Sequence, residues 1–380
     1  MSNSAKKEYL VEIKKRYSSA SKCEKSLILD QFCKVCGYNR KYAIRLIGSQ
    51  ENKHYKRKGR PRKYYSTTII DFLKDIWVVT NLACSKRLKA AIPLWLPFYT
   101  LHYKNSLSEK ERKLLLEISP RTIDRLLKRI KSKYKKFGLS TTKPGSLLKK
   151  QVPIKLNQWD ESIPGFVEAD TVAHCGSSVA GQFAYTLNIV DIATGWTEQR
   201  ALWGKGKRGV FEAIKSIREY LPFKILGFDC DNGSELLNYM LLEYFNGQKN
   251  PIQYTRSREY KKNDNAHIEE KNWTHVRQFI GYSRFDKIET VSMLNDLYLT
   301  EWRLYLNFFI PSFKLIEKKR DGAKIIKKFS NPLTPYQRLL ASEYIKTSVK
   351  KQLTKTFDLL DPFSLEIKLK NKIKSILKLY

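Results

Sequence analysis

The chain has 380 residues and carries 72 Lys and Arg against 37 Asp and Glu, which gives a formal net charge of +35. A small soluble domain usually carries a net charge of about 2 to 8. This excess therefore excludes an ordinary neutral globular protein and predicts a polyanionic partner, for which nucleic acid is the usual choice. Hydrophobic residues make up 42% of the chain, which excludes a wholly disordered basic chain. No apolar run reaches the roughly 18 residues of a membrane span, so we expect no membrane partner.

The charge is unevenly distributed along the chain. Residues 1–159 carry a net +27, residues 160–290 a net −2 and residues 291–380 a net +10. We therefore expect the basic flanks to supply most of the electrostatic binding to a polyanion. Carboxylates in the nearly neutral middle segment would be repelled by the same polyanion, and a bridging metal ion is the obvious reason to keep them.

Residues 1–50 are predicted to form a helix-turn-helix DNA-binding domain. The apolar pattern favours two helices before a turn at Gly37, and then a short basic helix over 39–47 with Asn39 as its N-cap. A helix, a tight turn and a basic helix are typical of the helix-turn-helix motif, and an ordinary helical bundle is the alternative. The predicted DNA contacts on the short helix are Arg40, Lys41 and Arg45.

A basic linker is predicted over residues 51–66. Its Gly-Arg-Pro-Arg stretch, residues 59–62, resembles the core of an AT-hook. Proline holds the backbone extended, so the flanking arginines can lie in a narrow A·T minor groove; a solvated linker is the alternative. The predicted DNA contacts are Arg57, Lys58, Arg60, Arg62 and Lys63.

A second helical DNA-binding domain is predicted over residues 67–137, followed by a linker over 138–159. Its clearest helix begins with Ser119 as N-cap and Pro120 in the first helical position, and extends to Ile130. The predicted DNA contacts on this helix are Arg121, Thr122, Arg125 and Lys128.

The segment 160–290 changes to strands. Strands are expected over 165–172, 182–191, 196–203, 224–231 and 252–255, and helices over 209–221, 235–245 (with Ser234 as its cap) and 265–280. The order predicts an α/β domain with a mixed five-stranded sheet, in which the third strand pairs antiparallel with the second. Asp170 and Asp231 are expected at strand ends, and Glu269 or Glu270 at the start of the last helix. That is the layout of a ribonuclease H-like domain, whose carboxylates hold two Mg²⁺ or Mn²⁺ ions about 3.5–4 Å apart.

Glu269 and Glu270 cannot both face the metal ions, because consecutive helical residues point about 100° apart; we expect Glu269 to do so. Asp229 is either a fourth ligand or a structural carboxylate, and His174 is expected to face DNA. The predicted DNA contacts around this helix are Lys261, Lys262, Asn263 and Lys271.

The segment 291–380 is predicted to be a mostly helical, basic C-terminal region. It includes an aromatic-rich helix over 294–309 and a basic stretch over 318–328 with a glycine turn, which we expect to touch DNA.

Several blocks carry a family resemblance, namely Glu-Ala-Asp-Thr at 168–171, Asp-Asn-Gly-Ser-Glu at 231–235 and the long block from Ser257 to Asn272. They resemble the integrase-core DDE transposases of bacterial insertion sequences, relatives of retroviral integrases. The resemblance covers most of residues 160–345. It implies that Asp170, Asp231 and Glu269 are the catalytic, metal-binding acids, and that the protein cuts transposon ends and joins their 3′-ends to target DNA.

The sequence thus predicts a DNA transposase that binds terminal inverted repeats, in a bacterial cytoplasm and associated with the nucleoid. Its partners would be double-stranded DNA, both transposon ends and target, and further copies of itself, because two ends must be held together. One alternative is a sequence-specific DNA-binding regulator with an inactive core. Another is a metal-dependent nuclease of the same fold.

Overall fold

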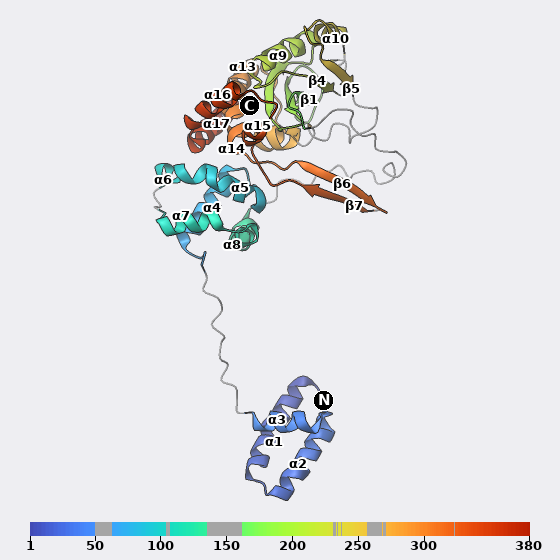
Figure 1. Ribbon diagram of the computed structural model, residues 1–380, viewed down its shortest axis with the longest axis vertical. Coiled ribbons are helices and arrows are strands. Elements are labelled where there is room, and N and C mark those ends of the chain that lie inside the picture. Colours follow the sequence, from blue (N-terminus) through green and yellow to red (C-terminus); the bar gives the residue numbers. More distant parts are fainter. Residues whose placement is uncertain are drawn as a thin grey trace. The chain divides into compact units, whose positions relative to one another are not determined.

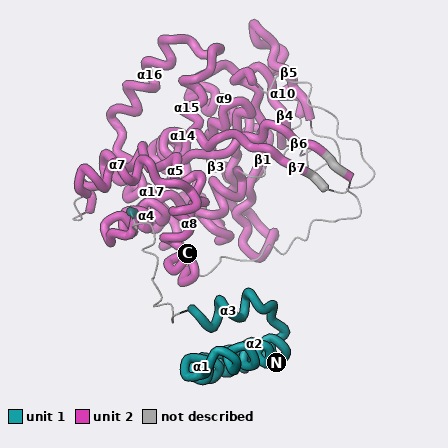
Figure 2. Tube along the Cα trace, turned by 60° about the horizontal axis from the view of Figure 1, so that its bottom comes forward, with its two compact units in different colours: residues 1–63 teal, residues 64–380 magenta. Residues whose placement is uncertain are grey.

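The computed structural model divides the chain into two compact units, residues 1–63 and 64–380, which are drawn in different colours in Figure 2. The structure describes residues 1–49, 63–103, 107–134, 162–230, 233, 235–236, 238–256, 268, 271–322 and 324–380. None of the helices within these ranges combines the length and the hydrophobicity needed to span a bilayer.

The first unit is a bundle of α1 (Asn3–Ser19), α2 (Lys22–Cys36) and α3 (Arg40–Gly48). Between α2 and α3, Gly37 adopts a left-handed conformation with φ of 66°, which glycine tolerates without strain. Asn39 caps α3 by accepting a hydrogen bond from the backbone N–H of Lys41, at 3.0 Å. The predicted turn and cap are therefore confirmed. The buried side chains that hold the bundle together are Ile13, Ile28, Leu29, Phe32, Cys36 and Ala43.

The second unit begins with a helical segment. It contains α4 (Thr67–Val79), α5 (Ser85–Trp95), the short turns η1 (Leu96–Phe98) and α6 (Tyr99–His102), α7 (Glu109–Glu117) and α8 (Pro120–Lys133). Ser119 caps α8 and Pro120 is its first residue, as predicted. The segment shares one hydrophobic core with the C-terminal helices, and Trp95 donates a hydrogen bond to the backbone carbonyl of Phe309 at 3.2 Å.

The second unit contains a mixed five-stranded sheet (Figure 1). Its strands are β1 (Phe166–Ala173), β2 (Ala184–Asp191), β3 (Thr197–Trp203), β4 (Gly227–Cys230) and β5 (Gln253–Arg256). They lie in the order β3-β2-β1-β4-β5, with β2 antiparallel to both β1 and β3, and with β4 and β5 parallel to β1. The predicted sheet and the predicted pairing of the second and third strands are confirmed.

The two faces of the sheet differ in chemistry. Val167 and Ala169 belong to an apolar cluster with α9 (Lys207–Tyr220) and α10 (Tyr239–Asn246), which cover one face. Because strand side chains alternate, Glu168 and Asp170 point to the opposite face. Around that second face lie the π-helical segment η3 (Asn272–Arg277), α12 (Gln278–Ile280), α13 (Glu289–Leu297), the π-helical segment η4 (Tyr298–Trp302) and α14 (Arg303–Phe309).

Some predicted element boundaries are wrong. Strand β1 continues to Ala173, so Asp170 lies inside it rather than at its end. Helix α10 begins at Tyr239 rather than at 235, because Asn238 provides its N-cap by accepting from the backbone N–H of Leu241. The predicted helix over 294–309 instead begins at Glu289.

The C-terminal region is only partly helical. The basic stretch that contains the predicted glycine turn is an antiparallel hairpin of β6 (Leu315–Asp321) and β7 (Lys324–Phe329). It is followed by α15 (Pro335–Ala341), α16 (Thr347–Asp358) and α17 (Pro362–Leu377). The β-branched residues Ile316, Ile325 and Ile326 favour strands, and Gly322 supplies the turn with φ of 56°.

Candidate active site

A row of polar side chains crosses the second face of the sheet. The strand registers set Asp170 of β1 opposite Asn188 of β2, and Asn188 opposite Gln199 of β3. The amide of Gln199 donates to the carbonyl oxygen of Asn188 at 3.2 Å. Asn188 and Gln199 are fully buried. Buried amides are costly unless they are hydrogen-bonded, so a row of this kind specifies one arrangement of side chains.

The helical segment that contains Asn272 lies alongside β1 and contacts it at three points. The Glu168 carboxylate accepts from the backbone N–H of Ile268 at 2.9 Å, and Asp170 accepts from the side-chain amide of Asn272 at 2.7 Å. The Arg277 guanidinium donates to the carbonyl of Ala173 at 2.6 Å. Asn272 also accepts from Asn188 at 2.9 Å, so it joins the row to Asp170.

The half-buried Asp170 carboxylate suits a hard cation. One oxygen accepts from the backbone N–H of Thr171 at 2.7 Å and the other from Asn272. Carboxylate oxygen is the ligand that Mg²⁺ prefers. The last residue of β4, Cys230, pairs with Ala169 next to Asp170, and Asp231 follows it in the sequence.

The other predicted acids, Asp231 and Glu269, lie outside the described residues, as does Glu270. Within the described ranges, no group of three or more His, Cys, Asp or Glu residues is arranged to hold a metal ion. A site at Asp170 would therefore need ligands from beyond those ranges.

Two neighbouring acids have structural partners. Asp229 accepts from the Thr255 hydroxyl at 2.6 Å, which favours the structural alternative over a fourth ligand. Asp191 accepts from the backbone N–H of Gly165, at 2.7 Å, and from both the backbone N–H and the hydroxyl of Thr194. Its complete burial raises the pKa of the Asp191 carboxyl to about 6. Asp191 thus holds the turn between β2 and β3.

The expectation that His174 faces DNA is wrong. The ring is fully buried, stacks on Phe285 and hydrogen-bonds to the Thr186 hydroxyl at 2.8 Å. Burial, with a smaller contribution from the nearby Arg277 cation, lowers the pKa of His174 to about 3. A histidine held neutral in the core has a packing role.

The expectation that Lys271 contacts DNA is also wrong, because only 8% of this residue is exposed. Its ammonium nitrogen lies 3.3 Å from Nε2 of the buried His275. Burial lowers the pKa of His275 well below its usual value, with a smaller contribution from Lys271. Lys271 therefore has little surface to offer to DNA.

The remaining residues that were predicted to contact DNA, where the structure describes them, lie on or near helices of both units. Arg40 is ion-paired with Asp30 and donates to Ser26, so it joins α3 to α2. The Arg125 guanidinium lies over the Tyr65 ring, 5.8 Å from its centre, and the Thr122 hydroxyl bonds to Ser119. The exposed positions are Arg40, Lys41, Arg45, Lys63, Arg121, Arg125 and Lys128. Outside the described residues lie Arg57, Lys58, Arg60, Arg62, Lys261, Lys262 and Asn263.

The sequence interpretation missed the roles of Glu168, Asn188, Gln199 and Asn272. Two of them carried a usable signal. Glu168 lies two residues before Asp170 and therefore on the same face of the strand. Asn272 lies three residues after Glu269, about one helical turn away. The roles of Asn188 and Gln199 depend on the register between neighbouring strands, which could not be predicted from the sequence.

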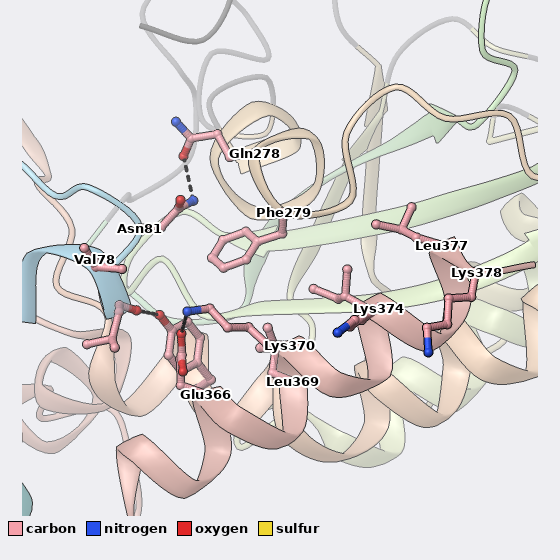
Figure 3. Close-up of a pocket in the computed structure, with 13 residues that line it drawn as sticks. Val78, Asn81, Gln278, Phe279, Glu366, Leu369, Lys370, Lys374, Leu377 and Lys378 are labelled. Carbon is pink, nitrogen blue, oxygen red and sulfur yellow. Dashed lines mark hydrogen bonds and ion pairs between the residues drawn. The ribbon is translucent and has the colours of Figure 1, made fainter. Parts of the chain in front are cut away.

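A separate cavity of 420 Å³ lies between the end of α4, α12 and α17 (Figure 3). On one side, Asn81 donates to Gln278 at 3.3 Å. On the other side Lys370, Lys374 and Lys378 line it at helical spacing. The cavity lacks the polar row of the sheet, so we place the candidate active site at Asp170.

Comparison with known proteins gives one extensive match. The chain is 37% identical over 347 residues to the uncharacterized protein y4rM of Sinorhizobium fredii, a match that covers 89% of this chain and 96% of that protein. No profile of a known protein family matches the chain.

Two solved structures are similar to part of the chain. The magnesium-bound catalytic core domain of HTLV-2 integrase matches with a TM-score of 0.30 and 13% identity, covering 40% of this chain and 93% of that one. The catalytic core domain of BIV integrase matches with a TM-score of 0.28 and 16% identity, covering 47% and 96%. The extensive match to y4rM does establish kinship, and this chain belongs to the same protein family as y4rM.

Proposed function

We propose that this protein is a DDE-type DNA transposase. It would bind the terminal inverted repeats of a mobile element, cleave at the ends and join the 3′-ends to target DNA by phosphoryl transfer. The catalytic and metal-binding residues would be Asp170, Asp231 and Glu269, with two Mg²⁺ or Mn²⁺ ions.

One observation carries the proposal: β1 is in contact with the sequence neighbours of both other acids. Ala169 pairs with Cys230, which precedes Asp231. On the other side, Glu168 and Asp170 are hydrogen-bonded to Ile268 and Asn272, which flank Glu269 in the sequence. A shared carboxylate site requires that the segments carrying its acids lie side by side, as the end of β4 and the helical segment do on either side of β1.

The described residues would hold this site in shape. Asn272 fixes one Asp170 oxygen, and the row through Asn188 and Gln199 fixes Asn272 in turn. The buried Glu168 ties the start of the helical segment to β1. When bound, the pair of ions would supply activation of the attacking oxygen and stabilisation of the leaving oxygen. The exposed basic side chains of α3 and α8 would bind the DNA backbone.

A strand-transfer assay tests the proposal. Full-length protein is incubated with Mg²⁺ or Mn²⁺, a plasmid target, and labelled duplexes made from the DNA that flanks its coding region. We expect cleavage at the 3′-end of an inverted repeat and a labelled product joined to the plasmid. Cleavage without joining would assign the protein to the nucleases. Specific binding without cleavage would assign it to the regulators.

A further inference from the structure

The hairpin β6–β7 is a basic ribbon that extends from the body of the second unit (Figure 1). Its residues 315–329 include six Lys or Arg and two acidic residues. The exposed fractions of Ile316, Ile326 and Phe329 are 62%, 48% and 51%. A ribbon with exposed lysines and exposed apolar side chains fits a partner that is both anionic and grooved.

The base of the ribbon is firmly attached. The backbone N–H of Ser330 donates to the Lys314 carbonyl at 2.8 Å, and the Lys314 backbone N–H donates to the Ser330 hydroxyl at 3.1 Å. The Lys314 ammonium donates to the Ala193 carbonyl in the turn between β2 and β3, at 3.2 Å. The ring centres of Phe313 and Phe329 lie 5.9 Å apart. These contacts tie the direction of the ribbon to the five-stranded sheet.

The charge of the ribbon favours an anionic partner. Lys319, Lys327 and Lys328 are exposed. Glu317 is ion-paired with Lys319 at 2.8 Å and lies opposite Lys328 in the strand register. The exposed cations would attract a polyanion and repel a basic protein surface.

We propose that the β6–β7 ribbon enters a groove of double-stranded DNA, with Lys327 and Lys328 binding phosphates. The major groove is about 12 Å wide and admits a two-stranded ribbon. Exposed isoleucines can contact thymine methyl groups there. The inference rests on the proposed function only in taking DNA as the partner, and it adds a contact surface outside the helical segments.

Charge reversal tests the ribbon in the full-length protein. The test variant is Lys327→Glu with Lys328→Glu, and the matched control is Lys351→Glu with Lys355→Glu on exposed positions of α16. Affinity for a random-sequence 30-base-pair duplex is measured by fluorescence anisotropy over a range of KCl concentrations. Losing two phosphate contacts lowers the slope of log affinity against log salt by about 1.8. We expect that change and at least a tenfold loss of affinity for the test variant alone. Equal slopes and affinities in the two variants would overturn the proposal.

A photocrosslink identifies the occupant of the ribbon directly. A benzophenone amino acid replaces Ile326, and in the control it replaces Leu359, which is 86% exposed. We expect a crosslink to the same duplex from position 326 only. A crosslink from position 326 to a second protein chain would overturn the proposal and assign the open strand edges to self-association.

The ribbon inference and the proposed function can be refuted separately. If the charge-reversed ribbon behaves like its control while the wild type still cleaves and joins DNA, the ribbon inference is wrong and the transposase stands. A wild type that does not bind the duplex refutes both.

Discussion

The side-chain amide of Asn272 donates a 2.7 Å hydrogen bond to the carboxylate of Asp170, across an interface between a helical segment and the central strand of the sheet. The same asparagine accepts a hydrogen bond from Asn188. Asn188 therefore orients Asn272, and Asn272 in turn orients Asp170. Groups that orient a metal ligand are a recurrent part of metal sites.

Replacing Asn272 by Ala should slow DNA cleavage without abolishing DNA binding. Loss of an orienting partner typically costs 10- to 100-fold in metal affinity or activity, and we expect a fall of about that size, together with a higher Mg²⁺ requirement. The measurement is the cleavage rate as a function of Mg²⁺ concentration. Asn246→Ala, at the exposed end of α10, is the control. A rate within twofold of the control would contradict the positioning role.

His174 should make stability depend on pH. Its pKa is about 3 in the folded protein, whereas an unfolded chain titrates near 6.5. The unfolded state therefore takes up the proton first. The contribution of His174 to stability is complete above pH 6.5 and is lost as the pH falls toward 3.

The test of His174 compares the wild type with His174→Gln by urea denaturation at several pH values. We expect the difference in free energy of unfolding between the two proteins to be largest at pH 7 and to shrink toward pH 4. The comparison cancels other titrating groups, including His275. A difference that stays constant between pH 7 and pH 4 would show that His174 is not held neutral in the fold.

Glu198 links the sheet to α14 through buried charge. Its carboxylate is fully buried and accepts from Arg303, at 2.9 Å and 3.1 Å, and from the Trp196 indole at 3.0 Å. The Arg200 guanidinium lies 3.8 Å away. Glu198→Gln leaves both arginines without their counter-charge and should cost about 3–5 kcal/mol of unfolding free energy. Chemical denaturation measures this, with the exposed Glu212→Gln as control. Equal stability of the two variants would contradict the assignment.

The first unit should fold and act separately from the second. Its own apolar cluster predicts that a fragment of residues 1–63 is helical by circular dichroism. Deleting these residues should leave the unfolding of the remaining chain unchanged but weaken binding to element ends. Undiminished affinity for the ends would show that this unit does not recognise them.

Much of the fold followed from the sequence because it rests on local signals. Gly37 and Asn39 mark a turn and a cap by their own chemistry, and Ser119 with Pro120 marks the start of α8. The strands of the sheet were recognisable as runs of apolar residues, and their mixed pairing was anticipated.

What the sequence missed depends on contacts between distant residues. The burial of His174 comes from Thr186 and Phe285, and that of Lys271 from packing around His275. Polarity alone placed both side chains on the surface. The sequence predicts only a basic stretch with a turn where the hairpin β6–β7 lies, because its strands lack the alternation of apolar and polar residues that is typical of strands.

The most direct test of the central claim is strand transfer by variants of the three acids. Asp170→Ala, Asp231→Ala and Glu269→Ala are each compared with the wild type, with Asp229→Ala as the control carboxylate. The account predicts that each of the three abolishes cleavage and joining of a terminal inverted repeat while DNA affinity is retained, and that the control stays active. Full strand transfer by any one of the three would contradict it.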